Sequence, residues 1–108
     1  MEPITEQEKN DFREFLSIIY GPQVNNWNIN LKVLELFGEL LQSSESCSRY
    51  MDMVPRPFVA GSVIKWASKQ ARGAIIRHLK NGGKHYLICL RAAGARMKTQ
   101  FYLASQGL

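Results

Sequence analysis

The sequence predicts an α+β fold, in which a small helical domain is followed by a C-terminal β-hairpin in the element order of a winged-helix module. Three observations support this class. Apolar residues recur at helical spacing as far as residue 81, the period changes to two beyond Gly83, and cations concentrate on the last helical segment and on the hairpin loop. A chain of 108 residues has the length of a single domain with one hydrophobic core.

The first helix is predicted to begin at Thr5. Thr5 and Glu8 have the spacing of a capping box, in which each side chain accepts a hydrogen bond from a backbone N–H group at the start of a helix. Gly21 and Pro22 supply the residues that end a helix. Between Thr5 and Gly21, four apolar residues recur at the spacings of one helical face, namely Phe12, Phe15, Leu16 and Ile19.

The second helix is predicted from about Leu31 to Gln42, after a loop rich in asparagine that ends in an N-cap at Asn30. Apolar residues occupy well over half of the circumference of this helix. We therefore expect it in the centre of the core or at a subunit interface, and interpret residues 1–42 as a helical scaffold that also forms a dimer interface.

Residues 43–60 are predicted to be a linker. Ser43 to Ser48 are polar and turn-prone, and a single helical turn fits around Tyr50 to Val54 before Pro55 and Pro57 prevent its continuation. Residues 61–104 then form a basic helical segment followed by a hairpin wing.

The helical segment is predicted over residues 62–81 and ends at Asn81-Gly82-Gly83. Gly73 lies in its middle, where glycine costs about 1 kcal/mol relative to alanine. One long helix and two shorter helices, over residues 62–69 and 72–81, both fit the pattern, and the sequence does not decide between them.

The hairpin is predicted from two runs. Residues 85–91 alternate between two faces, and residues 99–104 are rich in aromatic and branched side chains. The loop between them, residues 92–98, carries cations and would form the tip of the wing. On alternating faces, one of Phe101 and Tyr102 is expected to face solvent.

Charge is divided unevenly along the chain. All nine acidic residues lie at or before Asp52, whereas ten of the fourteen Lys and Arg residues follow it, and the formal net charge is +5. A segment with ten uncompensated cations repels itself, and a polyanionic partner is the usual compensation. The split therefore predicts binding to nucleic acid.

In a winged-helix module the helix before the hairpin enters the major groove and the wing contacts the backbone. The sequence thus predicts a sequence- or shape-specific double-stranded DNA-binding protein, a homodimeric transcriptional or plasmid- or phage-type regulator. Arg72 and Arg96 are the residues whose loss should matter most. The predicted nucleic-acid contacts are Lys65, Lys69, Arg72, Arg77, Lys80, Arg91, Arg96 and Lys98.

Two alternatives remain open. One is a binder of RNA or single strands that stacks bases on the hairpin aromatics, among which Tyr102 is the natural probe. The other is a protein-interaction module, an inhibitor or accessory subunit whose basic half docks on an acidic partner.

The sequence argues against an enzyme. Its carboxylates lie on helix faces that look solvated, His78 lies on an apolar stripe, and no nucleotide, hydrolase or metalloprotease motif is present. We predict no catalytic residue, no metal ligand and no cofactor. Cys47 and Cys89 lack metal-ligand spacing and fit reduced thiols, no apolar run reaches the length of a membrane span, and the N-terminus is acidic, so a cytoplasmic protein is expected.

Overall fold

The computed structural model describes residues 3–42, 59–60, 63–64 and 69–108, which are predominantly helical. Val59 pairs with Ile64, and Ala60 with Val63, in a short antiparallel ribbon. The predicted α+β fold with a C-terminal hairpin is therefore wrong, because residues 85–89 and 98–104 are helical. In chain order the elements are α1 (Glu6–Tyr20), the 3₁₀ helix η1 (Pro22–Asn26), α2 (Leu31–Gln42), β1 (Val59–Ala60), β2 (Val63–Ile64), α4 (Lys69–Cys89), α5 (Arg91–Ala95) and α6 (Lys98–Ser105).

Both N-terminal helices are confirmed. The Glu8 backbone N–H donates to Thr5 Oγ1 at 3.1 Å and the Thr5 N–H donates to Glu8 Oε1 at 3.0 Å, which completes the predicted capping box. Gly21 ends α1 with a φ of 97°, a conformation that favours glycine. Asn30 Oδ1 accepts from the Val33 N–H at 3.0 Å and so caps α2, as predicted.

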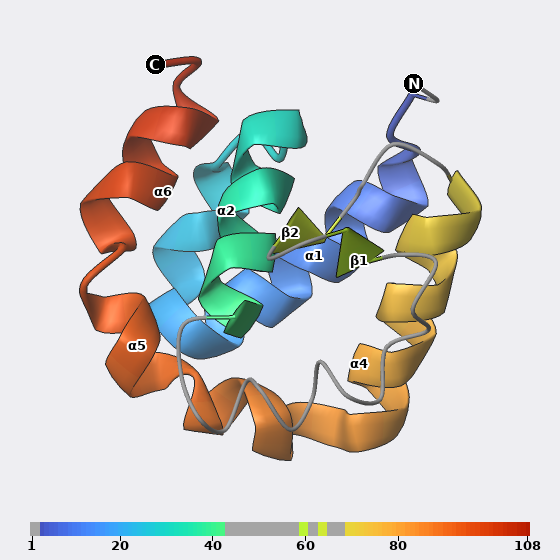
Figure 1. Ribbon diagram of the computed structural model, residues 1–108. Coiled ribbons are helices and arrows are strands. Elements are labelled where there is room, and N and C mark those ends of the chain that lie inside the picture. The colour runs from blue at the N-terminus through green and yellow to red at the C-terminus, as the bar shows by residue number, and fades with distance from the viewer. Residues whose placement is uncertain (1–2, 43–58, 61–62, 65–68) are drawn as a thin grey trace.

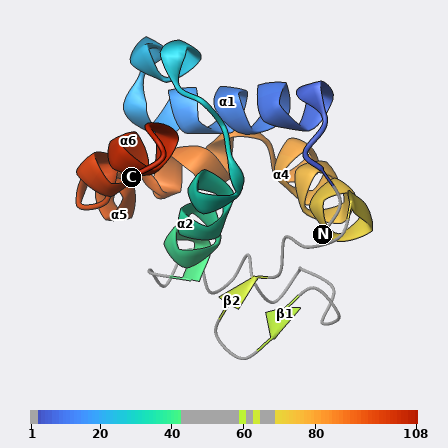
Figure 2. The same ribbon diagram turned by 90° about the horizontal axis from the view of Figure 1, so that it is seen from above.

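The C-terminal helices form an arc around α1 and α2 (Figures 1 and 2). Helix α4 packs against α1, α5 also contacts α1, and α6 packs against α2. Asn30 fixes the end of this arc, because its side-chain amide donates to the Ala104 carbonyl at 2.7 Å. The half of the chain that carries most of the cations thus wraps the half that carries the acids.

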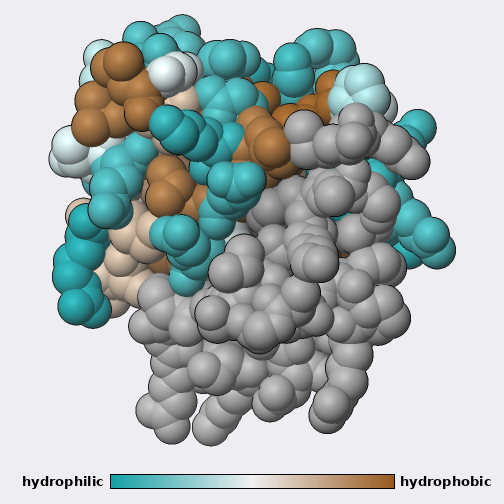
Figure 3. All heavy atoms as spheres, turned by 45° about the horizontal axis from the view of Figure 1, so that its top comes forward, coloured by the Kyte–Doolittle hydropathy of each residue, from teal (hydrophilic) through white to brown (hydrophobic). Residues whose placement is uncertain are grey.

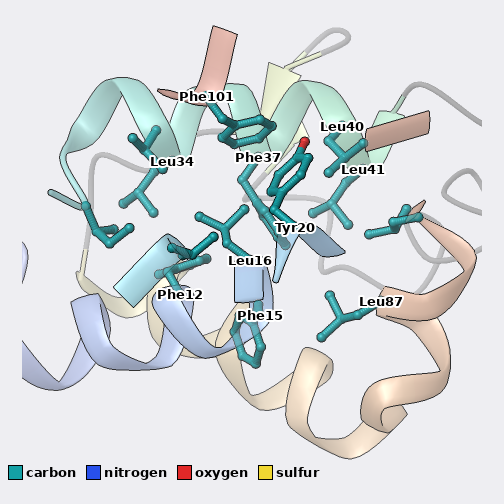
Figure 4. Close-up of a cluster of buried hydrophobic side chains, with 14 of the residues drawn as sticks. Phe12, Phe15, Leu16, Tyr20, Leu34, Phe37, Leu40, Leu41, Leu87 and Phe101 are labelled. Carbon is teal, nitrogen blue, oxygen red and sulfur yellow. The ribbon is translucent and has the colours of Figure 1, made fainter. Parts of the chain in front are cut away.

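The hydrophobic core lies inside this arc. Side chains from α1, α2, α4 and α6 point toward one another in Figure 4. The ring of Phe12 meets those of Phe15 and Phe37 edge to face, each at a centroid distance of 5.7 Å, a preferred geometry for aromatic pairs. Phe12, Phe37 and Phe101 are fully buried.

The apolar face of α2 is covered within one chain. Val33, Leu34, Phe37, Leu40 and Leu41 all have an exposed fraction of 0%. Figure 4 shows how residues of α1 and α6 meet those of α2. Of the two positions expected for this helix, the centre of the core is therefore confirmed, while the dimer interface stays a prediction.

The prediction of a hairpin is wrong because the side chains of residues 87–90 are not alternately buried and exposed, as a strand would require. Leu87 and Leu90 are buried, whereas Ile88 and Cys89 between them are exposed. Two strands would place Leu87 with Cys89 and Ile88 with Leu90. Burial instead continues at spacings of three and four residues, which is the period of a helix.

Helix α4 is one helix across Gly73, so the two-helix alternative fails for residues 69–81. Its predicted start at Ser62 is wrong as well, because Val63–Ile64 form strand β2. Asn81-Gly82-Gly83 does not end α4, which runs on to Cys89. The helix bends along its course (Figure 1), and paired glycines are a recognised cause of such bends. The predicted linker helix around residues 50–54 lies outside the described residues.

Candidate nucleic-acid interface

Arg72 lies in the interior and is not a surface contact. Its exposed fraction is 0%, and its Nε donates to Glu8 Oε2 at 2.7 Å. Its Nη2 donates to the Pro3 carbonyl at 3.0 Å. The prediction that Arg72 contacts nucleic acid is inconsistent with this placement, because the guanidinium is enclosed between α4 and the start of α1.

Lys80 forms a second link between the same two helices. Its Nζ lies 2.9 Å from Asp11 Oδ1, and its side chain is half exposed. The two ion pairs join residues on both sides of the charge boundary. Part of the uneven charge of the sequence is therefore complementarity between α1 and α4. Only the cations whose side chains reach the surface, the half-exposed Lys80 among them, are candidates for contact with a polyanion.

The remaining predicted contacts that the structure describes are exposed. The guanidinium of Arg91 is anchored at one atom, because its Nε donates to the Ile18 carbonyl at 3.0 Å. Lys65 lies outside the described residues. Among the described side chains, the exposed cations of the arc, including the half-exposed Lys80, are Lys69, Arg77, Lys80, Arg91, Arg96 and Lys98.

The fold divides these cations into two groups. Lys69, Arg77 and Lys80 lie on the first part of α4, whereas Arg91, Arg96 and Lys98 lie on α5 and the start of α6. These segments are on opposite sides of the arc in Figure 1. The molecule measures 32 × 31 × 24 Å, and one turn of duplex DNA is about 34 Å long. The longest dimension of the molecule is therefore close to the length of one helical turn.

No protein-family model, curated protein or solved structure matches this chain. A functional assignment therefore depends on the residues themselves.

Among the described residues, no group of three His, Cys, Asp or Glu side chains is arranged to hold a metal ion. No described helix has the length and apolar character needed to cross a membrane. His78 is half-buried and Cys89 is an exposed free thiol.

The importance of Glu8 and Asp11 was missed in the sequence, where they were interpreted as a solvated acidic helix start. The signal was nevertheless present. Glu8 is four residues before Phe12, and Asp11 is four residues before Phe15, so both carboxylates lie on the buried face of α1. Carboxylates on a buried face require partners, and a distant cation is the simplest one.

The Glu8–Arg72 pair predicts a pH-dependent stability. Burial alone would raise the pKa of Glu8, but hydrogen bonds from Arg72 and Thr5 and the charge of Arg72 outweigh it, so the pKa lies below its ordinary value of 4.5. The unfolded chain then binds the proton more readily, so this stabilisation is complete above pH 4.5 and is lost as the pH falls through the folded-state pKa.

Urea unfolding of the wild type and Glu8→Gln, from neutral pH downward, measures this contribution. We expect the difference in unfolding free energy to shrink below pH 4.5. Glu14→Gln is the matched control, since Glu14 is exposed on the same helix. A wild-type advantage over Glu8→Gln that stays constant with pH would contradict the buried pair.

Proposed function

We propose that this protein binds double-stranded DNA through the outer surface of the arc formed by α4, α5 and α6. One observation carries the proposal. Among the side chains that the structure describes, this surface exposes six cations, and the chain has no carboxylate side chain anywhere after Asp52. Contacts with phosphate supply most of the affinity of non-specific DNA binders, and Lys and Arg are the residues that make them.

The mode of binding follows from the arrangement of the cations. Neither a recognition helix followed by a wing nor a cluster of arginines on one face is available in the described residues. The cations lie instead in two groups along a curved surface. Such a surface suits contacts with the phosphates of both strands, with preference set by the shape and flexibility of the duplex rather than by base edges.

The compartment, the regulatory role and the oligomeric state are also part of the proposal. A free, exposed thiol at Cys89 is typical of a reducing compartment, which favours the cytoplasm. A regulatory role, as in the plasmid or phage regulators expected from the sequence, would follow from binding to defined sites. Neither the homodimer nor its position at the N-terminal helices is needed for the phosphate contacts.

Titration of a fluorescently labelled duplex at several salt concentrations tests the proposal. We expect affinity to fall steeply with salt, because each neutralised phosphate contributes about −0.9 to the slope of log K against log salt. Undetectable binding at low salt would contradict the proposal. So would equal competition by poly-glutamate, which would favour an acidic protein partner instead.

A single-strand binder is the second candidate, because Tyr102 exposes 50% of its surface while Phe101 is buried. The expectation that one of these two rings faces solvent is confirmed, although helical geometry is the cause. The Tyr102 ring also packs edge to face with the Trp27 ring, at a centroid distance of 6.5 Å, so it has a packing role as well. If duplex DNA is the ligand, Tyr102→Ala leaves affinity unchanged and single strands compete poorly.

A further inference from the structure

A groove between α2 and α6 combines an apolar floor with an acidic rim. Its volume is about 350 Å³, within the range of ligand-binding clefts. Leu36, Leu103 and Leu108 line it, and the exposed fractions of Leu103 and Leu108 are 41% and 75%. Figure 3 shows hydrophobic surface between hydrophilic side chains over this side of the molecule.

The rim is formed by Glu35 and Glu39, which are exposed and one helical turn apart on α2. Neither carboxylate has a cation within ion-pair distance among the residues that the structure describes. Lys32, on the same rim, uses its Nζ to donate to the Leu108 carbonyl at 2.7 Å. Like charges four residues apart on a helix repel each other. The groove therefore favours a partner that brings both apolar and positively charged side chains.

The same chain carries a surface of that description across the junction of α4 and α5. Ile88 exposes 52% of its surface, and Ala92 and Ala95 follow it on the exposed side at spacings of four and three residues. Arg91 and Arg96 are exposed on this short stretch. We call the five residues the cationic ridge, and buried Leu87, Leu90 and Ala93 fix its orientation outward.

We propose that the groove between α2 and α6 receives the cationic ridge of a second copy of this chain. The apolar residues of the ridge, Ile88, Ala92 and Ala95, would cover Leu103 and Leu108. Arg91 and Arg96 would pair with Glu35 and Glu39 of the copy that supplies the groove. Ridge and groove are different surfaces, so the contact is heterologous and leaves one of each free. Copies therefore associate head to tail, unlike a two-fold dimer through the N-terminal helices.

The inference does not rest on the proposed DNA binding. Because both contacts use Arg91 and Arg96, a duplex and a second copy would compete for them, and the test therefore uses nuclease-treated protein. Sedimentation equilibrium of the wild type should show a weight-average mass that rises above 12.3 kDa with concentration and continues past the dimer. Glu35→Lys should weaken this association at least tenfold. Glu14→Lys makes the same charge change at an exposed site on α1 and should leave the association near that of the wild type.

A mixing experiment identifies both surfaces. Glu35→Lys damages the groove and Ile88→Asp damages the ridge, so each variant alone should stay monomeric at a concentration at which the wild type has begun to associate. A mixture should form a 1:1 dimer and nothing larger, through the intact ridge of the first variant and the intact groove of the second. Circular dichroism confirms that both variants are folded.

Three results would overturn the proposal. The first is a wild type that stays monomeric at every concentration. The second is an equal effect of Glu35→Lys and Glu14→Lys, which would place the contact elsewhere. The third is a mixture of the two damaged variants that remains monomeric.

Discussion

Replacing Arg72 with methionine is expected to lower the free energy of unfolding by about 3–5 kcal/mol, the range seen when one member of a buried ion pair is removed. Methionine fills much of the space of the arginine stem but leaves Glu8 without its guanidinium partner. Glu8 has only 9% of its side chain exposed, so water would solvate the unpaired carboxylate only weakly. The Pro3 carbonyl loses its hydrogen bond from Nη2 as well.

Arg77→Met is the matched control for this prediction, because it makes the same substitution five residues further along α4. Arg77 is exposed, and surface substitutions usually change stability by less than about 0.5 kcal/mol. Urea unfolding followed by circular dichroism measures both variants. The double variant Glu8→Gln and Arg72→Met should lose less than the sum of the single losses, because the two side chains interact. Equal stabilities of the two Arg→Met variants would contradict the buried position of Arg72.

Gly94→Ala is expected to destabilise the fold by about 1–3 kcal/mol, the cost of overpacking a close contact. A Cβ atom at this position would lie 2.8 Å from Ile19 Cγ2 and 3.2 Å from Tyr20 Oη. Ile19 is β-branched and has little freedom to move away. Displacement of α5 would also strain the hydrogen bond in which Tyr20 Oη donates to the Gly94 carbonyl at 2.8 Å.

The same substitution at Gly73 should have the opposite sign. Among the described residues, a Cβ atom there would approach only Arg77 Nη1, at 3.6 Å, which is an ordinary contact. Alanine is favoured over glycine inside a helix by up to about 1 kcal/mol, so Gly73→Ala should stabilise the protein. Thermal unfolding of both variants tests the pair of predictions. Stabilisation by Gly94→Ala, or marked destabilisation by Gly73→Ala, would be inconsistent with the packing described above.

The N-terminal half could be predicted from sequence because its signals are local. The capping box at Thr5, the glycine at position 21 and the N-cap at Asn30 each act within a few residues. The strand prediction for residues 85–91 was wrong because a short alternating run is compatible with both the two-residue period of a strand and the 3.6-residue period of a helix. A longer window distinguishes them, since the buried residues Leu87, Leu90, Ala93, Phe101 and Ala104 recur at helical rather than alternating positions.

The candidate site was predictable only in part. The absence of carboxylates after Asp52 is visible in the sequence, and it indicated a cationic surface. The sequence does not show which cations face inward. Arg72 and Glu8 are 64 residues apart in the chain, so their contact arises only from the packing of α4 on α1. Arg96, by contrast, remains exposed where a surface contact was expected.

We propose that the charge split serves two purposes: Arg72 joins α4 to α1, and the exposed cations of the arc bind duplex DNA. A comparison of Lys98→Ala with Lys32→Ala, in which duplex affinity is measured at several salt concentrations, tests this proposal. Both lysines are exposed and lose the same charge, but only Lys98 lies on the arc. We predict that Lys98→Ala weakens binding and reduces the magnitude of the salt slope by about 1, whereas Lys32→Ala leaves both unchanged. Equal effects of the two substitutions, or none from either, would contradict the claim.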